Sequence, residues 1–369
     1  MLPTPRILKR VVNIIPKQPV CFWRLINMKR LQQGFTLIEL MISLILGLLV
    51  SAAALQILYT NSLSSNIQSA GSKIVDTNTF GLDYLTKQIR KANYGILSSQ
   101  SFFLNHQTPQ GGIVLTAPDN LTVFGNTVAG ETVASNLRGL SKSNQQISDT
   151  LLTRSASSLS GSNVKFGSTP LSSDQLTIQY KVSSDNQVDC QSRNVMKDDY
   201  VIERYFVRDG GLACASAIYT YNETTAQTNQ INIDTYTKPD GTVGTSNLAG
   251  NGEIIIPNVD YFRVLLGISD SKNFSTDPST YTLTYMPIPT PISTVNADPF
   301  PTLNNRRIVN VQIGLLVRSD GSVTASKDPS FRVLDKTDIK LNDTSKNDGK
   351  MRRVLETTVF LRNARGTVQ

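Results

Sequence analysis

The sequence has few of the residues that catalytic and metal sites require. Its 369 residues include a single histidine, His106, which lies in a polar stretch. One histidine gives neither a histidine-ligated metal cluster nor a Ser-His-Asp arrangement. A phosphate-binding glycine loop is also missing, because Gly111-Gly112 is too short and a strand candidate follows it. We therefore predict no catalytic residue, no metal site and no cofactor.

Charged residues are also scarce, at 17% of the chain. Two pairs of acids lie close together in a region rich in serine and asparagine, Asp185 with Asp189 and Asp198 with Asp199. They lack the glycine and terminal glutamate of a calcium-binding loop. We expect these four acids to be solvated turn residues.

Acidic residues are absent from residues 1–34, which contain seven lysines and arginines. The whole chain has 36 basic and 28 acidic residues, so removal of this segment leaves 29 against 28. A basic flank beside a membrane explains this distribution better than a nucleic-acid-binding surface. We predict no direct nucleic-acid binding.

Charge and proline are both missing from Leu40–Leu58. As a helix this run is about 28 Å long, close to the hydrocarbon thickness of a bilayer. Lys29 and Arg30 precede it, and no further lysine or arginine occurs before Lys73. This asymmetry places the N-terminus in the cytoplasm and the rest of the chain outside. The alternative, a soluble core helix, does not explain a run that is apolar on every face.

Glu39 is a carboxylate at the edge of this apolar run. A charge in this position is costly unless it is paired or lies at the membrane interface. If the chain is cut after Gly34, the new α-amino group of Phe35 lies one helical turn away. Pairing within one chain or between packed helices would then neutralise both charges. The alternative is an interfacial glutamate without a partner.

The segment Gly34–Leu40, GFTLIEL, resembles the class III signal of type IV pilins and type II secretion pseudopilins. The resemblance implies that a prepilin peptidase cuts between Gly34 and Phe35 and methylates the Phe35 amine. It gives Glu39 the role of recognising that amine during assembly. Leaders of this family are short, so we expect the true start at Met28 and regard residues 1–27 as a gene-start artefact.

The rest of the chain predicts an α+β fold, with a long helix followed by a mainly antiparallel sheet. Residues 35–59 would form the transmembrane or filament-core helix, residues 60–94 its amphipathic continuation, and residues 95–369 a β-rich head. The strand candidates are Gly112–Ala117, Leu121–Gly125, Gln175–Val182, Tyr200–Arg208, Glu253–Ile256, Tyr261–Ile268, Arg307–Arg318 and Arg353–Arg362. Thr220–Asn251 and Ser269–Asn304 are predicted to be loops.

Three further segments, Leu82–Gly95, Ile308–Ser319 and Arg352–Asn363, resemble PilW-type minor pilins. This resemblance implies a structural subunit, not an enzyme, that helps to initiate or cap a type IV pilus. Its partners would be a prepilin peptidase, other minor and major pilins, the inner-membrane assembly platform and membrane lipid. The implied location is the inner membrane with a periplasmic head, then the pilus surface. Twitching motility, cell adhesion and DNA uptake are processes that such pili serve.

Two other functions fit parts of the same pattern. Type II secretion pseudopilins share the signal, and a membrane-anchored extracytoplasmic binding protein or enzyme would share the apolar helix. The binding protein or enzyme predicts an uncut Gly34–Phe35 bond and a pocket with convergent polar groups.

The three cysteines are Cys21, Cys190 and Cys214. Cys21 precedes the cut, so a mature chain that leaves the cytoplasm keeps an even pair. A disulfide between Cys190 and Cys214 would close a loop of about 25 residues and stabilise the fold by on the order of 3 kcal/mol. Two unpaired thiols are the alternative, and the pair is too small a ligand set for tetrahedral zinc.

Overall fold

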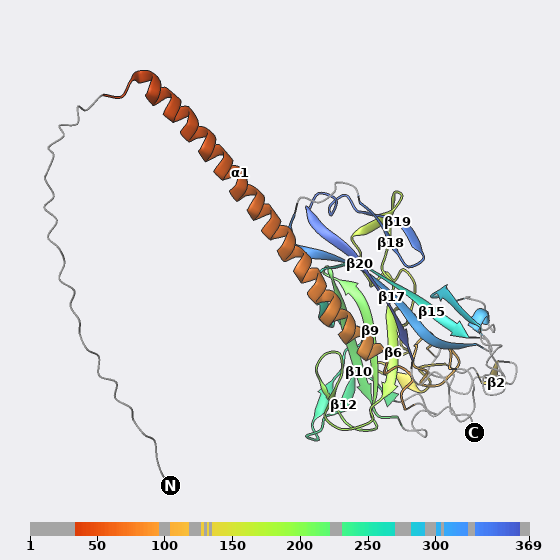
Figure 1. Ribbon diagram of the computed structural model, residues 1–369. Helices are drawn as coiled ribbons and strands as arrows, with labels where there is room; N and C mark the ends of the chain where they lie inside the picture. The colour runs from red at the N-terminus through yellow and green to blue at the C-terminus, as the bar shows by residue number, and fades with distance from the viewer. Residues whose placement is uncertain are drawn as a thin grey trace, which may run out of the picture. The chain divides into compact units, whose positions relative to one another are not determined.

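The computed structural model divides the chain into two units, residues 1–59 and residues 60–369 (Figure 1). The described residues are 34–95, 104–117, 127–128, 131–132, 135–221, 231–269, 282–291, 300–303, 306–323 and 329–361. The predictions for residues 1–33, including Cys21 and Met28, and for the strand candidate Leu121–Gly125 lie outside this description.

The N-terminal helix extends through three consecutive segments. They are α1 (Leu37–Asp76), the π-helix η1 (Thr77–Leu82) and α2 (Asp83–Ile89). Turns then lead to Gly95, whose positive φ of 70° lets the chain leave the helical path. The predicted long helix is therefore confirmed, with a start two residues later and an end five residues earlier than expected.

A π-helix, η1, lies within the part of the helix that has a buried side. A π turn holds more residues than an α turn, so it delays the rotation of the side chains around the axis. Ile74 before η1 and Leu82 at its end are both buried. Leu85 and Ile89 then continue the buried side and have no exposed surface.

A four-stranded antiparallel sheet, which we call sheet A, has the order β14-β10-β9-β6. Its strands are β6 (Leu176–Lys181), β9 (Tyr200–Arg208), β10 (Gly211–Tyr219) and β14 (Glu253–Pro257). β9 and β10 form a hairpin whose turn residues Asp209 and Gly210 both have positive φ. The sequence did not predict β10.

A second four-stranded antiparallel sheet, sheet I, has the order β16-β15-β17-β20. Its strands are β15 (Val259–Ser269), β16 (Leu283–Pro287), β17 (Arg307–Ser322) and β20 (Lys350–Phe360). Three of the four were predicted. β16 lies within the segment Ser269–Asn304, so the prediction of an uninterrupted loop there was wrong.

A third sheet has the order β18-β19-β4-β5, and the other strands pair in two-stranded ribbons. These strands are β1 (Thr127–Val128), β2 (Glu131–Thr132), β3 (Leu140–Ser141), β4 (Val164–Phe166), β5 (Thr169–Pro170), β7 (Gln187–Val188), β8 (Asn194–Val195), β11 (Ile231–Asn232), β12 (Thr235–Thr237), β13 (Val243–Thr245), β18 (Ser330–Val333) and β19 (Lys336–Leu341). β11, β12 and β13 interrupt the predicted loop Thr220–Asn251. The predicted strand Gly112–Ala117 makes only an isolated bridge, from Ile113 to Ile178.

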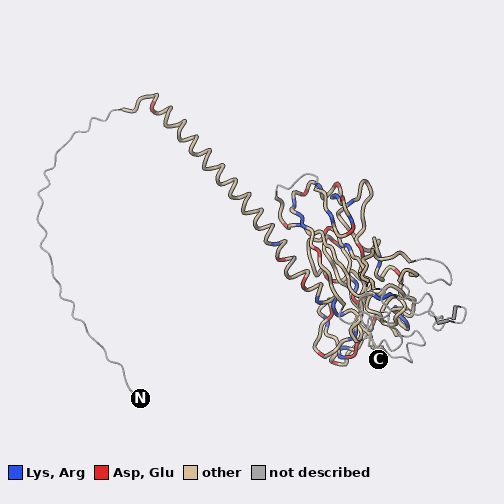
Figure 2. The backbone as a smooth tube through the Cα atoms, turned by 45° about the vertical axis from the view of Figure 1, so that its right-hand side comes forward, with Lys and Arg blue, Asp and Glu red and all other residues tan. Residues whose placement is uncertain are grey.

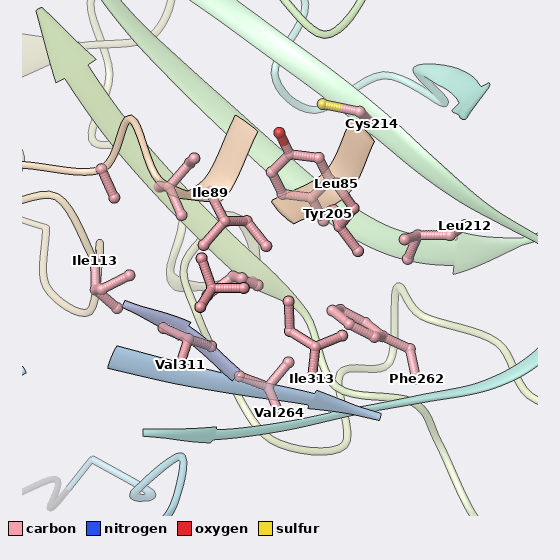
Figure 3. Close-up of a cluster of buried hydrophobic side chains, with 14 of the residues drawn as sticks. Leu85, Ile89, Ile113, Tyr205, Leu212, Cys214, Phe262, Val264, Val311 and Ile313 are labelled. Atoms are coloured by element: carbon pink, nitrogen blue, oxygen red, sulfur yellow. The ribbon is translucent and has the colours of Figure 1, made fainter. Parts of the chain in front are cut away.

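The principal core lies between sheet A, sheet I and the end of the helix. Figure 3 shows Leu85 and Ile89 of α2 near Tyr205 of sheet A and near Val264 and Ile313 of sheet I. All five side chains have no exposed surface. Burial of side chains of this size stabilises a fold by about 1.5–3 kcal/mol each. The amphipathic half of the helix is thus an integral part of the head.

Candidate functional site

The first part of α1 is an apolar surface that no described residue covers. All residues from 34 to 59 are exposed, and the large side chains among them include Phe35, Leu48 and Val50. By length and composition the helix Leu37–Ile89 can cross a membrane, and its most apolar 18-residue window has a mean hydropathy of 2.3. A helix that is apolar all round needs lipid or other apolar helices around it.

The polar groups at the start of this helix are satisfied locally. The backbone N–H of Glu39 donates to the Thr36 hydroxyl at 3.3 Å, so Thr36 acts as the N-cap. The hydroxyls of Ser43 and Ser51 donate to backbone carbonyls within their own helix, at 2.9 and 2.8 Å. Such bonds lower the cost of placing serine in an apolar medium.

Gly34 and Phe35 lie just before the helix, and Glu39 lies in its first turn. Residues 40–72 contain no charged side chain, and Figure 2 shows the helix after its first turn as a long uncharged stretch. The next charge along the described helix is Lys73, which pairs with Asp320 at 2.9 Å. The structure thus groups the predicted cleavage residues with Glu39 at one end of the apolar surface.

The structure confirms the predicted disulfide between Cys190 and Cys214. Their Cα atoms are 6.2 Å apart, within the usual range for a disulfide. Cys214 lies in the central strand β10, while Cys190 belongs to the connection between β7 and β8. Both are buried, so the bond fastens this connection to the sheet.

A buried carboxylate, Glu203 on β9, lies beside the disulfide. It accepts hydrogen bonds from the Tyr180 hydroxyl at 3.0 Å, the Cys190 backbone N–H at 2.9 Å and the Tyr205 hydroxyl. Burial raises the pKa of Glu203, and the positive charge of Lys91 partly opposes this rise. The sulfur atoms and Glu203 lie close enough to suggest a metal site, but the sulfurs are joined to each other.

Asp189 is also buried, although the sequence predicted a solvated turn residue. It accepts hydrogen bonds from the Arg193 side chain at 2.7 Å and from the Ser216 hydroxyl at 2.8 Å. Asp199 was wrongly predicted in the same way: it is buried and accepts from the Thr220 hydroxyl at 2.9 Å. The prediction is correct for Asp185 and Asp198, which are exposed.

A buried ion pair joins the two main sheets. Arg263 of β15 lies 3.1 Å from Asp174, which precedes β6, and 2.7 Å from Asp335. Asp174 also accepts the backbone N–H of Val264 at 2.8 Å. A charge buried without such partners would be strongly destabilising, so this cluster fixes how the sheets meet.

Sequence reasoning missed Glu203, although a signal was present. Val201, Glu203 and Tyr205 lie on the same face of strand β9. Val201 is apolar, and Tyr205 is apolar except for its hydroxyl. An acid at an inward position predicts a buried carboxylate. The role of Asp189 had no comparable signal, because it depends on Ser216 in a strand that was not predicted.

The raised pKa of Glu203 predicts a pH effect on stability. Because the folded head binds this proton more tightly than the unfolded chain, stability falls as pH rises above the ordinary value of 4.5 and through the raised pKa. Glu203→Gln should remove this component, so its unfolding temperature should change less between about pH 5 and pH 8. Thermal unfolding of the full chain in detergent measures this. Glu356→Gln, at an exposed acid, is the control, and a Glu203→Gln profile parallel to wild type would contradict the prediction.

The comparisons with known proteins agree with this geometry. Residues 217–363 match the family described as type IV pilus-assembly protein W, PilW. Residues 29–55 match the prokaryotic N-terminal methylation motif. No curated protein matches the chain.

Among solved structures, the chain is similar to a type IV-like pilin from Thermus thermophilus. The identity is 10% over 79% of this chain and 98% of that pilin, with a TM-score of 0.31. The two family matches lie on the exposed apolar helix and on the sheets of the head. The chain therefore carries an N-terminal methylation motif and, over residues 217–363, a region that matches the family of type IV pilus-assembly protein W, PilW.

Proposed function

We propose that a prepilin peptidase cleaves this minor pilin between Gly34 and Phe35 and that the new Phe35 amine is then methylated. The structure supports access to this bond, because Gly34, Phe35 and Thr36 precede the helix and Phe35 is 82% exposed. A protease needs an accessible segment outside regular structure. The mature chain would begin with the apolar helix.

Before assembly, residues 35–59 would span the inner membrane with the N-terminus in the cytoplasm and the head in the periplasm. The positive charges before the helix and their absence from its apolar part support this orientation. The disulfide of the head also suits an oxidising compartment. The membrane would keep the apolar surface away from water until the subunit is extracted.

The observation that carries the proposal is the position of Glu39. It is an exposed carboxylate in the first turn of an exposed apolar helix, close to the proposed new amine. Once such helices pack together, an unpaired carboxylate would be buried at a large cost. Pairing with the Phe35 amine of its own or a neighbouring chain offsets that cost and fixes how the helices align.

Assembly would exchange lipid around the helix for the helices of other pilins, so the apolar surface stays covered throughout. The subunit would help to initiate or cap the pilus, with other minor and major pilins and the inner-membrane assembly platform as partners. The PilW domain supports a pilus rather than a secretion pseudopilus. Twitching motility, adhesion and DNA uptake are the processes through which its loss would be observed.

Mass spectrometry of sheared surface filaments tests this proposal. We expect a mature chain that begins with N-methylated Phe35, and no peptide from residues 1–34. Gly34→Leu, which puts a bulky side chain at the bond, should accumulate as uncut precursor in the membrane. Filaments that contain uncut wild-type chain, or wild-type chain confined to the membrane with residues 1–34 intact, would contradict the proposal.

A further inference from the structure

The two main sheets have four outer edges: one is bonded to other segments of the chain, and two belong to strands of only five residues. The edge of β6 bonds to the preceding segments, with N–H···O distances of 2.9 Å from Gln179 to Gly112 and 2.8 Å from Lys181 to Tyr94. β14 has five residues, ends at Pro257 and packs on η1 through Ile256, which lies 3.2 Å from where a Cβ on Gly81 would stand.

The outer edge of β16 is short and interrupted. This strand also has five residues, and its last residue, Pro287, has no N–H to offer. Proteins commonly protect sheet edges in these ways, because a free row of backbone groups can pair with another strand.

The fourth edge, β20, is eleven residues long, and no strand among the described residues pairs with its outer side. The Leu361 N–H donates to the Val309 carbonyl at 3.0 Å, and the register pairs Phe360 with Asn310. In an antiparallel ladder, alternate residues then direct their backbone groups away from β17. These outward residues include Val354, Glu356, Thr358 and Phe360. Within the described residues 350–361, their N–H groups donate no hydrogen bond.

The side chains along this edge form a second part of the surface. Phe360 is 59% exposed and Glu356 is also exposed. A pocket of about 690 Å³ adjoins them, between sheet I and the turn after β18. Val354 and Glu356 line it together with Leu265, Gln312, Arg332, Leu334 and Asp335. One Glu356 oxygen accepts the Leu334 N–H at 2.7 Å, which holds the turn over the sheet.

We propose that the β20 edge is a strand-addition site for an extended segment in the head of another pilin subunit. This proposal rests on the assembly of the chain with other pilins. The open run from Val354 to Phe360 is about 20 Å long and accepts a strand of roughly seven residues. Backbone hydrogen bonds give such a site affinity, and side chains opposite the edge give it specificity.

The chemistry of the edge defines the incoming strand. Residues directly opposite each other project from the same face of a sheet and contact one another. The partner therefore carries apolar side chains opposite Val354 and Phe360. It carries a lysine or arginine opposite Glu356, where the pocket accommodates a long side chain beside a carboxylate. A seven-residue strand pairing is too small to be a stable interface alone. It orients a subunit already held by its helix.

A proline substitution can block pairing at the outer edge of β20 while it leaves the hydrogen bonds between β20 and β17 in place. Thr358→Pro removes one outward N–H and places a ring where the partner strand would lie, while the neighbouring residues keep their bonds to β17. Thr358→Ala removes the same side chain and keeps the N–H. We expect Thr358→Pro to lower incorporation into sheared filaments by about tenfold, and Thr358→Ala to lower it less than about twofold.

Equal incorporation of the proline and alanine variants would overturn the strand proposal. Both must keep the Cys190–Cys214 disulfide and the wild-type unfolding temperature. If Thr358→Pro does not, Phe360→Glu provides the same test at an exposed side chain, with a similar loss expected. Wild-type chain absent from filaments would instead refute the proposed function, so the two failures are distinct.

A photoreactive benzophenone in place of Phe360 then identifies the occupant. In cells that make the full set of pilins, we expect adducts on an extended head segment of another pilin that contains apolar and basic residues in alternate positions. Adducts on a second copy of this chain or on its own residues would overturn the proposal. So would an absence of adducts while filaments still contain the labelled chain.

Discussion

Glu39→Ala is expected to leave cleavage at Gly34 largely intact and to lower incorporation into filaments by about tenfold or more. Cleavage acts on the segment before the helix, and Glu39 lies in the first turn. Incorporation buries the apolar helix, and the methylated Phe35 amine would then lack a carboxylate partner. The ratio of mature chain in sheared filaments to mature chain in membranes measures the effect.

A second variant is needed because Glu39 also occupies a favourable position within its own helix. It stands three residues after the N-cap Thr36, where glutamate and glutamine both support a helix start. Glu39→Gln keeps this capability and removes the charge. If the ion pair matters, Gln and Ala variants should show similar losses. Wild-type incorporation of Glu39→Gln would remove the ion pair from the mechanism and leave helix capping as the function of Glu39.

The N-terminal helix could be predicted because its determinants are local. An uncharged apolar run about as long as the hydrocarbon core of a bilayer is thick, with basic residues on one side, specifies both helix and orientation without knowledge of the head. The π-turn at Thr77–Leu82 was not predicted as such. Leu82 and Ile89 on either side of its end pack in the core between the two sheets, and the local sequence does not show that packing.

The missed strand β10 shows the opposite case. Its sequence, GLACASAIY, is rich in glycine, alanine and serine, which have low intrinsic preference for strands. All nine residues are nevertheless buried, because the strand is paired on both sides by β9 and β14. Small side chains leave room for the Cys214 disulfide and for Ser216 to reach Asp189. Tertiary packing therefore overrode local preference.

The same tertiary dependence explains the errors at the acids. Asp189 and Asp198 have similar polar neighbours in sequence, yet Asp189 is buried and Asp198 is exposed beside Lys181 at 2.8 Å. The difference arises because the disulfide holds Cys190 against β10 and brings Asp189 with it. A pair of cysteines could be predicted from their even number, but the residues drawn into the core by the bond could not.

Replacement of both Cys190 and Cys214 by alanine is expected to lower the free energy of unfolding of the head by about 3 kcal/mol. The bond spans 24 positions of sequence, so its loss returns substantial freedom to the unfolded chain. We also expect residue 190 to become more mobile in the folded state. Without the disulfide, only the hydrogen bond from its backbone N–H holds it beside Glu203. Chemical denaturation of the full chain in detergent measures the change.

Ser192→Ala is the control, because it changes an exposed side chain in the same connection and leaves the disulfide intact. It should unfold as the wild type does. The double variant should also exchange the Cys190 and Arg193 amide hydrogens faster, since the connection between β7 and β8 is no longer fastened to β10. A stability loss without faster exchange would mean that the bond acts only on the unfolded chain. Unchanged stability in the double variant would show that buried Asp189, with Arg193 and Ser216, holds the connection without the bond.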